Sequence, residues 1–234
     1  MKPILGVLVL VPLMEAFAVA QEPTADAKEG RVYLEGGLGF GVMTMAAPAT
    51  TSTGFDSIAE FAVGFAAEYG INDQFAIFTK LGVALGLDDD PGIVTFGMTF
   101  DGAYKILDKK ADVPALSAFA GLGFVNLDVD PKASIGNGKS DSATDFVLEF
   151  GLQADFGPAD GSWSFQPFFE VQVVAGSRPK PGGFKTYNGM LQIAGGAKVL
   201  FKLADNLFLE PGVTFTGGNF SDSVVFGVGI QLRL

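Results

Sequence analysis

Residues 145–156 have the sequence DFVLEFGLQADF, in which every even position is apolar. The odd positions include Asp145, Glu149, Gln153 and Asp155. Because successive side chains of a β-strand point to opposite faces, this stretch predicts a strand with one apolar face and one mostly polar or small face. About ten segments of the chain share the pattern, so the sequence predicts an all-β protein.

The composition indicates how those strands are used. The chain has 234 residues, of which 48% are hydrophobic, 32 are glycine and 23 are phenylalanine. After the N-terminal segment, no stretch approaches the roughly 18–20 unbroken apolar residues of a membrane helix. The apolar excess is spread over alternating strands instead, which is consistent with one large all-β domain.

The N-terminal 30 residues predict export. Lys2, an apolar core from Ile4 to Met14 and the cleavage motif Ala18-Val19-Ala20 together indicate a signal peptide over residues 1–20. Residues 21–30 are polar and predict a flexible periplasmic leader, and residues 31–234 form the predicted barrel. Export combined with a membrane pattern made only of strands points to a bacterial outer membrane.

The predicted architecture is a closed antiparallel up-and-down transmembrane β-barrel. Its expected strands lie at 31–43, 57–69, 75–87, 93–106, 116–128, 144–156, 163–175, 187–202, 207–216 and 223–234. Ten is an even number, as bacterial single-chain barrels require, and the longest connections fall on one side. An eight-stranded barrel is the alternative if the predicted boundaries split the chain into one pair of strands too many.

The bulky face of each strand is predicted to face lipid. Strand 93–106 offers Val94, Phe96, Met98, Phe100 and Tyr104 to this face. Roughly fifty bulky side chains could not fit inside so small a barrel, which argues against a soluble barrel with an apolar interior. Burial of each outward Phe or Leu in hydrocarbon contributes about 1.5–3 kcal/mol.

Aromatic residues near the predicted strand ends suggest membrane-interface girdles. Tyr69, Tyr104, Trp163 and Tyr187 have the outward parity, whereas Tyr33 has the inward parity. Ordinary strand composition is the alternative explanation.

The inward parity carries charges that the sequence places mainly in the periplasmic half. This lumen charge cluster, structural or gating, consists of Glu35, Glu68, Lys80, Asp101, Lys105, Asp155, Glu170, Lys198, Lys202, Glu210 and Arg233. Glycines occupy much of the remaining lumen: Gly37, Gly39, Gly41, Gly64, Gly82, Gly97, Gly121, Gly123, Gly151, Gly196, Gly227 and Gly229. One hypothesis is a salt-bridged periplasmic plug beneath an emptier outer vestibule. The alternative is that glycines let a narrow barrel close and the charges fill it.

Several chemistries are excluded or disfavoured. The chain has no cysteine, so it forms no disulfide, and its net charge of −11 disfavours nucleic-acid binding. It also has no histidine, on which the enzymes built on small outer-membrane barrels rely. We therefore predict no enzyme activity, no catalytic residue, no cofactor and no metal site, with a histidine-free enzyme as a minor alternative.

Two predicted outer loops carry other candidate features. Asp88-Asp89-Asp90 could hold Ca²⁺ or Mg²⁺ but lacks the spacing of a known calcium loop, so a solvent-exposed turn is the simpler expectation. Residues 130–145, DPKASIGNGKSDSATD, predict a mobile surface loop that could contact partners.

The segments GINDQFAIFTKLGV and LADNLFLEPGVTF join Asn/Asp turns to alternating strands. In this respect residues 31–234 resemble the superfamily of OmpA-like and OmpW-like outer-membrane barrels. The final strand, SVVFGVGIQLRL, is similar to the signal that the barrel-assembly machinery recognises, although it ends in Leu234 where that signal usually has an aromatic residue.

The resemblance implies a non-enzymatic barrel of a Gram-negative envelope: a narrow, porin-like channel or small-molecule binding barrel, or a structural protein. A surface adhesion or recognition barrel that acts through its extracellular loops is the alternative. The expected partners are outer-membrane lipid or lipopolysaccharide and the barrel-assembly machinery, with no nucleic acid, and the expected state is a monomer.

Overall fold

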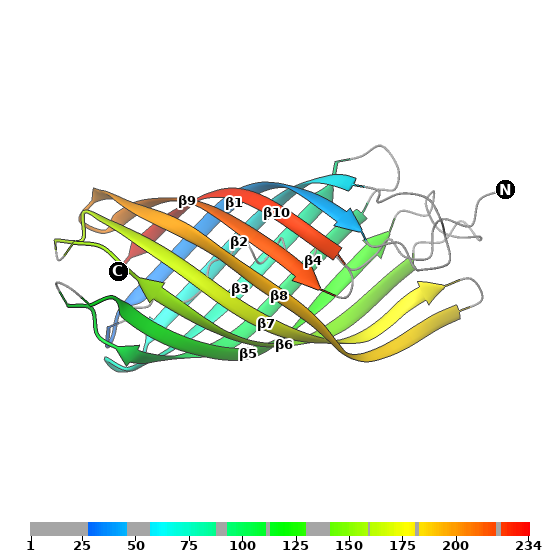
Figure 1. Cartoon of the computed structure of the whole chain (residues 1–234), viewed down its shortest axis with the longest axis horizontal. Coiled ribbons are helices and arrows are strands. Elements are labelled where there is room, and N and C mark those ends of the chain that lie inside the picture. The colour runs from blue at the N-terminus through cyan, green and yellow to red at the C-terminus, as the bar shows by residue number, and fades with distance from the viewer. Residues whose placement is uncertain are drawn as a thin grey trace.

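The computed structural model describes residues 28–45, 57–87, 93–110, 113–129, 141–158, 160–180, 183–218 and 221–234. These residues form ten antiparallel strands arranged as a barrel (Figure 1). The strands are β1 (Val32–Met45), β2 (Ser57–Gly70), β3 (Phe75–Gly86), β4 (Ile93–Leu107), β5 (Ala115–Val129), β6 (Asp141–Asp155), β7 (Trp163–Lys180), β8 (Gly183–Ala204), β9 (Leu207–Gly218) and β10 (Ser221–Arg233). None of the described residues belongs to a helix that could cross a membrane.

The barrel closes because β1 pairs with β10 as well as with β2. We can start at Tyr33 on β1 and step from each residue to its paired residue on the next strand, once around the barrel. This path returns to β1 at Met45, so the strands are staggered by twelve residues in one circuit. With standard strand spacings, this stagger corresponds to a strand tilt of about 40° and a backbone radius of about 10 Å. The tilt is visible in Figure 1. The prediction of ten strands is confirmed, and the eight-stranded alternative is excluded.

The two ends of the barrel differ in their connections. The turn end holds the connections after β2, β4, β6 and β8 together with the C-terminus, and the loop end holds the connections after the odd-numbered strands. At the turn end, the Asn72 side chain accepts hydrogen bonds from the backbone N–H groups of Gln74 and Phe75, each at 2.8 Å. In the turn before β7, the Ser162 N–H donates to Asp160 and lowers the pKa of that exposed carboxyl group.

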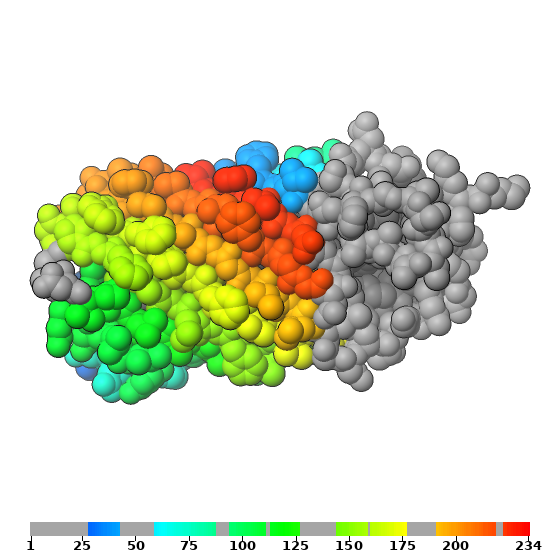
Figure 2. All heavy atoms as spheres, in the orientation of Figure 1, coloured from blue at the N-terminus to red at the C-terminus, as the bar shows by residue number. Residues whose placement is uncertain are grey.

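The outer surface of the wall is apolar, as the alternation predicts. More than thirty large apolar side chains are exposed, among them Phe146 at 68% and Phe226 at 65%. Figure 2 shows the side chains of successive strands forming a continuous wall. The outward Thr79 hydroxyl donates to the backbone oxygen of Thr99 at 2.8 Å, so its polar group is satisfied within the wall. Water does not accommodate so much contiguous apolar surface, whereas hydrocarbon does.

Aromatic residues with polar edges gather at the turn end. Tyr69, Tyr104 and Trp163 are about half exposed on the outer surface, close to the ends of their strands. Tyr33 points inward and is buried, as its parity predicts. The side chain of Tyr187 lies outside the described part of the structure. The three outward rings occupy the level expected for one interfacial girdle.

Two outward prolines coincide with interruptions of the hydrogen-bonded ladder. The β6–β7 ladder stops after the pair Gln153–Phe168, next to Pro167, and continues only as an isolated bridge. The β8–β9 ladder likewise lacks pairs opposite Pro211. Proline has no backbone N–H to donate, so each interruption has a local cause.

Strand ends at the loop end extend further than the sequence predicts. The predicted loop from Gly176 to Thr186 is mostly β7–β8 ladder, which continues to the pair Lys180–Gly183. β6 also begins at Asp141 rather than at residue 144. Hairpin pairing continues beyond the lipid-facing band, where the apolar alternation that marks a strand in the sequence stops. Residues 1–27, Asp88–Asp90 and residues 130–140 lie outside the described residues, as do the predictions made for them.

The inside of the barrel is packed with side chains. Near the turn end, Phe78, Ala103 and Phe119 form one buried apolar cluster. Nearer the loop end, Ala62, Ala84 and Val225 form a second. Buried polar and charged side chains lie between and beyond these two layers.

A lipid-facing charge should be costly at the middle of the wall and tolerated at its edge. Phe150→Arg should destabilise the barrel by at least about 2–4 kcal/mol, because its guanidinium would lie near the bilayer midplane. Thr144→Arg, on the same face of β6 but at the loop end, should cost about 0–1 kcal/mol. Reversible urea unfolding in phospholipid vesicles measures both, and equal costs would contradict the assigned membrane position.

Candidate functional site: a charged network in the barrel lumen

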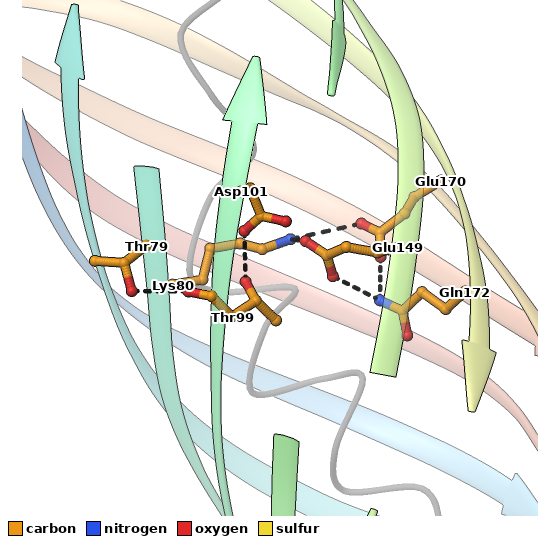
Figure 3. A network of polar contacts seen from close by, with 7 residues as sticks. All are labelled: Thr79, Lys80, Thr99, Asp101, Glu149, Glu170 and Gln172. Carbon is orange, nitrogen blue, oxygen red and sulfur yellow. Dashed lines mark hydrogen bonds and ion pairs between the residues drawn. The ribbon is translucent and has the colours of Figure 1, made fainter. Parts of the chain in front are cut away.

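Lys80 is the centre of the most extensive polar network in the described lumen (Figure 3). It lies near the middle of β3, and its side chain is completely buried. Its Nζ atom lies 2.7 Å from Oε1 of Glu149 and 3.7 Å from Oε2 of Glu170. One ammonium group therefore neutralises part of the charge of two carboxylates inside the barrel.

The three residues come from β3, β6 and β7, which are not all neighbours. The strand tilt brings them to one level, since each step around the barrel raises the paired position by about 3 Å. By this register, Lys80, Glu149 and Glu170 lie within about 5 Å of the same height. Their side chains then meet across the lumen, as Figure 3 shows.

Neutral polar groups support the charged ones. The Gln172 amide donates to Glu149 at 3.5 Å and to Glu170, so it bridges the two carboxylates. On β4, the Thr99 hydroxyl donates to Asp101 at 2.7 Å. A buried ion pair is tolerated only when further hydrogen bonds satisfy its remaining acceptors, and these contacts supply part of that requirement.

Aromatic rings lie beside Lys80 on the turn-end side. The ammonium is 5.9 Å from the Phe78 ring centroid and 5.7 Å from that of Phe119, within the range of cation–π attraction. The two rings meet edge to face, with centroids 6.0 Å apart. The Phe119 ring occupies the space that a side chain at Gly151 would need, so this glycine permits the close approach.

Two smaller polar groups lie nearer the turn end. Asp155 accepts a bond of 2.7 Å from Lys109 and one of 3.0 Å from Gln166. Lys198 lies 3.9 Å from Glu35, and Glu210 is a further electrostatic neighbour of this pair.

Arg233 closes the β1–β10 seam at the same end. Its guanidinium carbon lies 3.9 Å from the Phe208 ring centroid and 5.8 Å from that of Tyr33. The Nε–H of Arg233 also donates to Gln231 at 2.7 Å.

The predicted lumen charge cluster is therefore divided among several groups. Lys80 and Glu170 meet near mid-height, with Asp101 beside them, whereas Asp155, Glu35, Lys198, Glu210 and Arg233 belong to the turn-end groups. Glu68 is buried on β2. Lys105 and Lys202 form ion pairs with the exposed Asp108 and Asp205 at the mouth.

Sequence reasoning left out some members of the network. Glu149 and Gln172 share the inward parity of their strands, so parity alone could have included them. Lys109 lies outside any strand, and no pattern in the sequence indicated that its side chain reaches Asp155. Within the described ranges, no group of three or more His, Cys, Asp or Glu side chains that could hold a metal ion comes together.

Comparisons with known proteins define the class of fold. No family model matches the chain, and no curated protein sequence matches it either. Among solved structures, it is similar to the translocator domain of the autotransporter NalP from Neisseria meningitidis, with a TM-score of 0.53 and 8% identity over 94% of this chain and 92% of that one.

Two further solved structures have similar scores. The outer-membrane protease OmpT from Escherichia coli gives a TM-score of 0.53 and 8% identity over 91% of this chain and 99% of that one. An outer-membrane channel from Pseudomonas putida F1 gives a TM-score of 0.51 and 8% identity over 92% of this chain and 99% of that one. At this identity the likeness concerns the fold alone, and that fold is the transmembrane β-barrel of bacterial outer membranes.

The charge balance around Lys80 can be tested by stability. Lys80→Met should destabilise the barrel by about 3–5 kcal/mol, because it leaves Glu149 and Glu170 facing each other without a cation. The triple variant Lys80→Met/Glu149→Gln/Glu170→Gln should recover most of this loss. Urea unfolding in vesicles measures both changes.

Lys202→Met is the matched control, since it removes the same charge from a pair with an exposed partner. We expect this control to change stability by no more than about 1 kcal/mol. If Lys80→Met and Lys202→Met have the same free energy of unfolding, the ion pairs of Lys80 with Glu149 and Glu170 do not stabilise the barrel.

Proposed function

We propose that this chain is a non-enzymatic outer-membrane barrel whose narrow lumen conducts small ions and is closed at rest by the Lys80 network. The observation that carries the proposal is the complete burial of Lys80 and Glu149 at mid-height, where their ion pair crosses the lumen. An open aqueous pore at this level would leave such side chains accessible to water.

Two features support conduction once the network opens. Ion pairs can exchange partners or break, and their charged groups can then solvate a passing ion, whereas an apolar core offers no polar group to replace the water around an ion. Carboxylates also outnumber cationic side chains among the described inward-facing residues, and acidic linings favour cations. The inward carboxylates are Glu35, Glu60, Glu68, Asp101, Asp145, Glu149, Asp155, Glu170 and Glu210.

Location and biogenesis form part of the same proposal. The predicted signal peptide over residues 1–20 would direct export, with the turn end of the barrel in the periplasm. The outward row Val224, Phe226 and Val228 on β10 supports recognition by the barrel-assembly machinery through the final strand. Contact with lipid and lipopolysaccharide and a monomeric state are consistent with a wall that is apolar all round.

The proposal excludes catalysis on chemical grounds. The sequence has no histidine to act as a general base, and the two carboxylates nearest mid-height, Glu149 and Glu170, form ion pairs with Lys80. OmpT is a protease, but its likeness to this chain concerns the fold.

Single-channel recording in planar bilayers tests the function. The natural protein should be mostly closed, with brief cation-selective openings. Lys80→Met should lengthen the openings, because the unpaired carboxylates would draw water and cations into the lumen. Lys202→Met should behave like the natural protein. The triple variant Lys80→Met/Glu149→Gln/Glu170→Gln should recover most of the stability that Lys80→Met loses, so it shows whether longer openings come from the unpaired carboxylates or from a loss of folding. A steady ohmic pore that Lys80→Met leaves unchanged would overturn the proposal.

A further inference from the structure

A second polar layer lies in the lumen beyond the Ala62–Ala84–Val225 cluster, toward the loop end. By the strand register, its members fall within about 6 Å of one height, although they come from six different strands. We name this layer the outer polar ring; it consists of Glu60, Thr95, Asp145, Gln192, Thr216 and Ser223, all of them buried.

Glu60 is the unusual member of the ring. Its side chain is 2% exposed, and neither of its carboxylate oxygens has a hydrogen-bond partner among the described residues. Its paired neighbours on β1 and β3 are Gly41 and Gly86, which have no side chain to offer. The next inward residue on β2 is Ala62, which belongs to the apolar cluster.

Among the described side chains, no cationic group lies at the level of the ring. Every lysine and arginine whose side chain is described lies nearer the turn end, and Lys80 is four residues along β3 from Ala84 in that direction. Asp145, buried against Gly176, adds a second carboxylate at the same level. A buried carboxylate without a partner is strongly unfavourable, so Glu60 must either hold a proton or take a counter-charge from outside the described residues.

The rest of the ring supplies neutral oxygen atoms. The hydroxyls of Thr95, Thr216 and Ser223 have no hydrogen-bond partner among the described residues. The amide of Gln192 is fully buried and likewise without a described partner. Carboxylate, hydroxyl and amide oxygens are the ligands of hard cations, and Ca²⁺ tolerates irregular sets of them better than Mg²⁺ does.

We propose that Glu60 and the neutral oxygens of the outer polar ring bind a hard inorganic cation, with Ca²⁺ preferred. The site lies on the loop-end side of the Lys80 network. It concerns binding, and it holds whether or not the barrel conducts ions. With one direct carboxylate and neutral ligands, we expect a weak site, with a dissociation constant on the order of 10⁻⁴–10⁻³ M.

The test uses the whole protein in neutral detergent micelles, with equilibrium dialysis of Ca²⁺ and thermal unfolding followed by circular dichroism. Millimolar CaCl₂ should raise the melting temperature of the natural protein above its value in NaCl of equal ionic strength, and MgCl₂ should raise it less. Glu60→Gln should bind Ca²⁺ at least about tenfold more weakly and lose the shift. In chelator, Glu60→Gln should melt no lower than the natural protein, since a neutral amide is less costly to bury than a carboxylate.

Asp222→Asn is the matched control, because Asp222 is an exposed carboxylate at the same end of the barrel. It should keep the full calcium response, whereas Thr95→Val should weaken it. A natural protein without a calcium-specific shift would overturn the proposal and leave Glu60 as a protonated acid. An equal shift in Glu60→Gln and the natural protein would overturn it as well, and would place the ion elsewhere.

Discussion

The structure depends on one constraint: hydrocarbon accepts apolar side chains but no unsatisfied backbone group. A closed barrel satisfies the ladder hydrogen bonds of its strands, and the pleat then gives each strand one outward and one inward face. With the outward face given to Phe, Leu and Val, polar and small residues are left for the interior. The two-residue alternation around Phe150 is therefore the direct consequence of placing a strand between lipid and a narrow lumen.

The same arrangement creates the electrostatic problem of the interior. Nine described carboxylates lie inside a barrel whose radius leaves little room for water, and charges in such surroundings must find partners. Lys80 serves two of them at mid-height, and Lys109 and Lys198 serve others at the turn end. Glu60 stands apart, because the chain places no described cation at its level. The Lys80 network neutralises buried carboxylates with a lysine of the chain itself, whereas the outer polar ring is proposed to neutralise Glu60 with a bound cation.

Much of the fold follows from the sequence, because alternation is a local property. The ten strands, their inward and outward faces and the inward position of Tyr33 are all predicted by parity. The ends of β6, β7 and β8 are not, since the hairpins continue beyond the lipid band, where the apolar alternation is lost. The approach of Lys80 to Glu149 is not predictable either. These residues lie three strands apart, and only the stagger of the whole barrel brings them to one height. Parity identifies which charges face the lumen, but the register decides which of them meet.

The orientation of the wall can be tested directly, because the chain has no cysteine and a single one can be introduced at will. Spin labels placed one at a time from Phe146 to Leu152, and at Phe96, should report environments that alternate with a period of two. At Phe96, Phe146, Leu148, Phe150 and Leu152, oxygen dissolved in the bilayer should relax the label strongly and a water-soluble nickel chelate should not. Free access of the chelate to labels at Phe96 and Phe150, or a natural protein that is monomeric and soluble in water without detergent, would contradict the account.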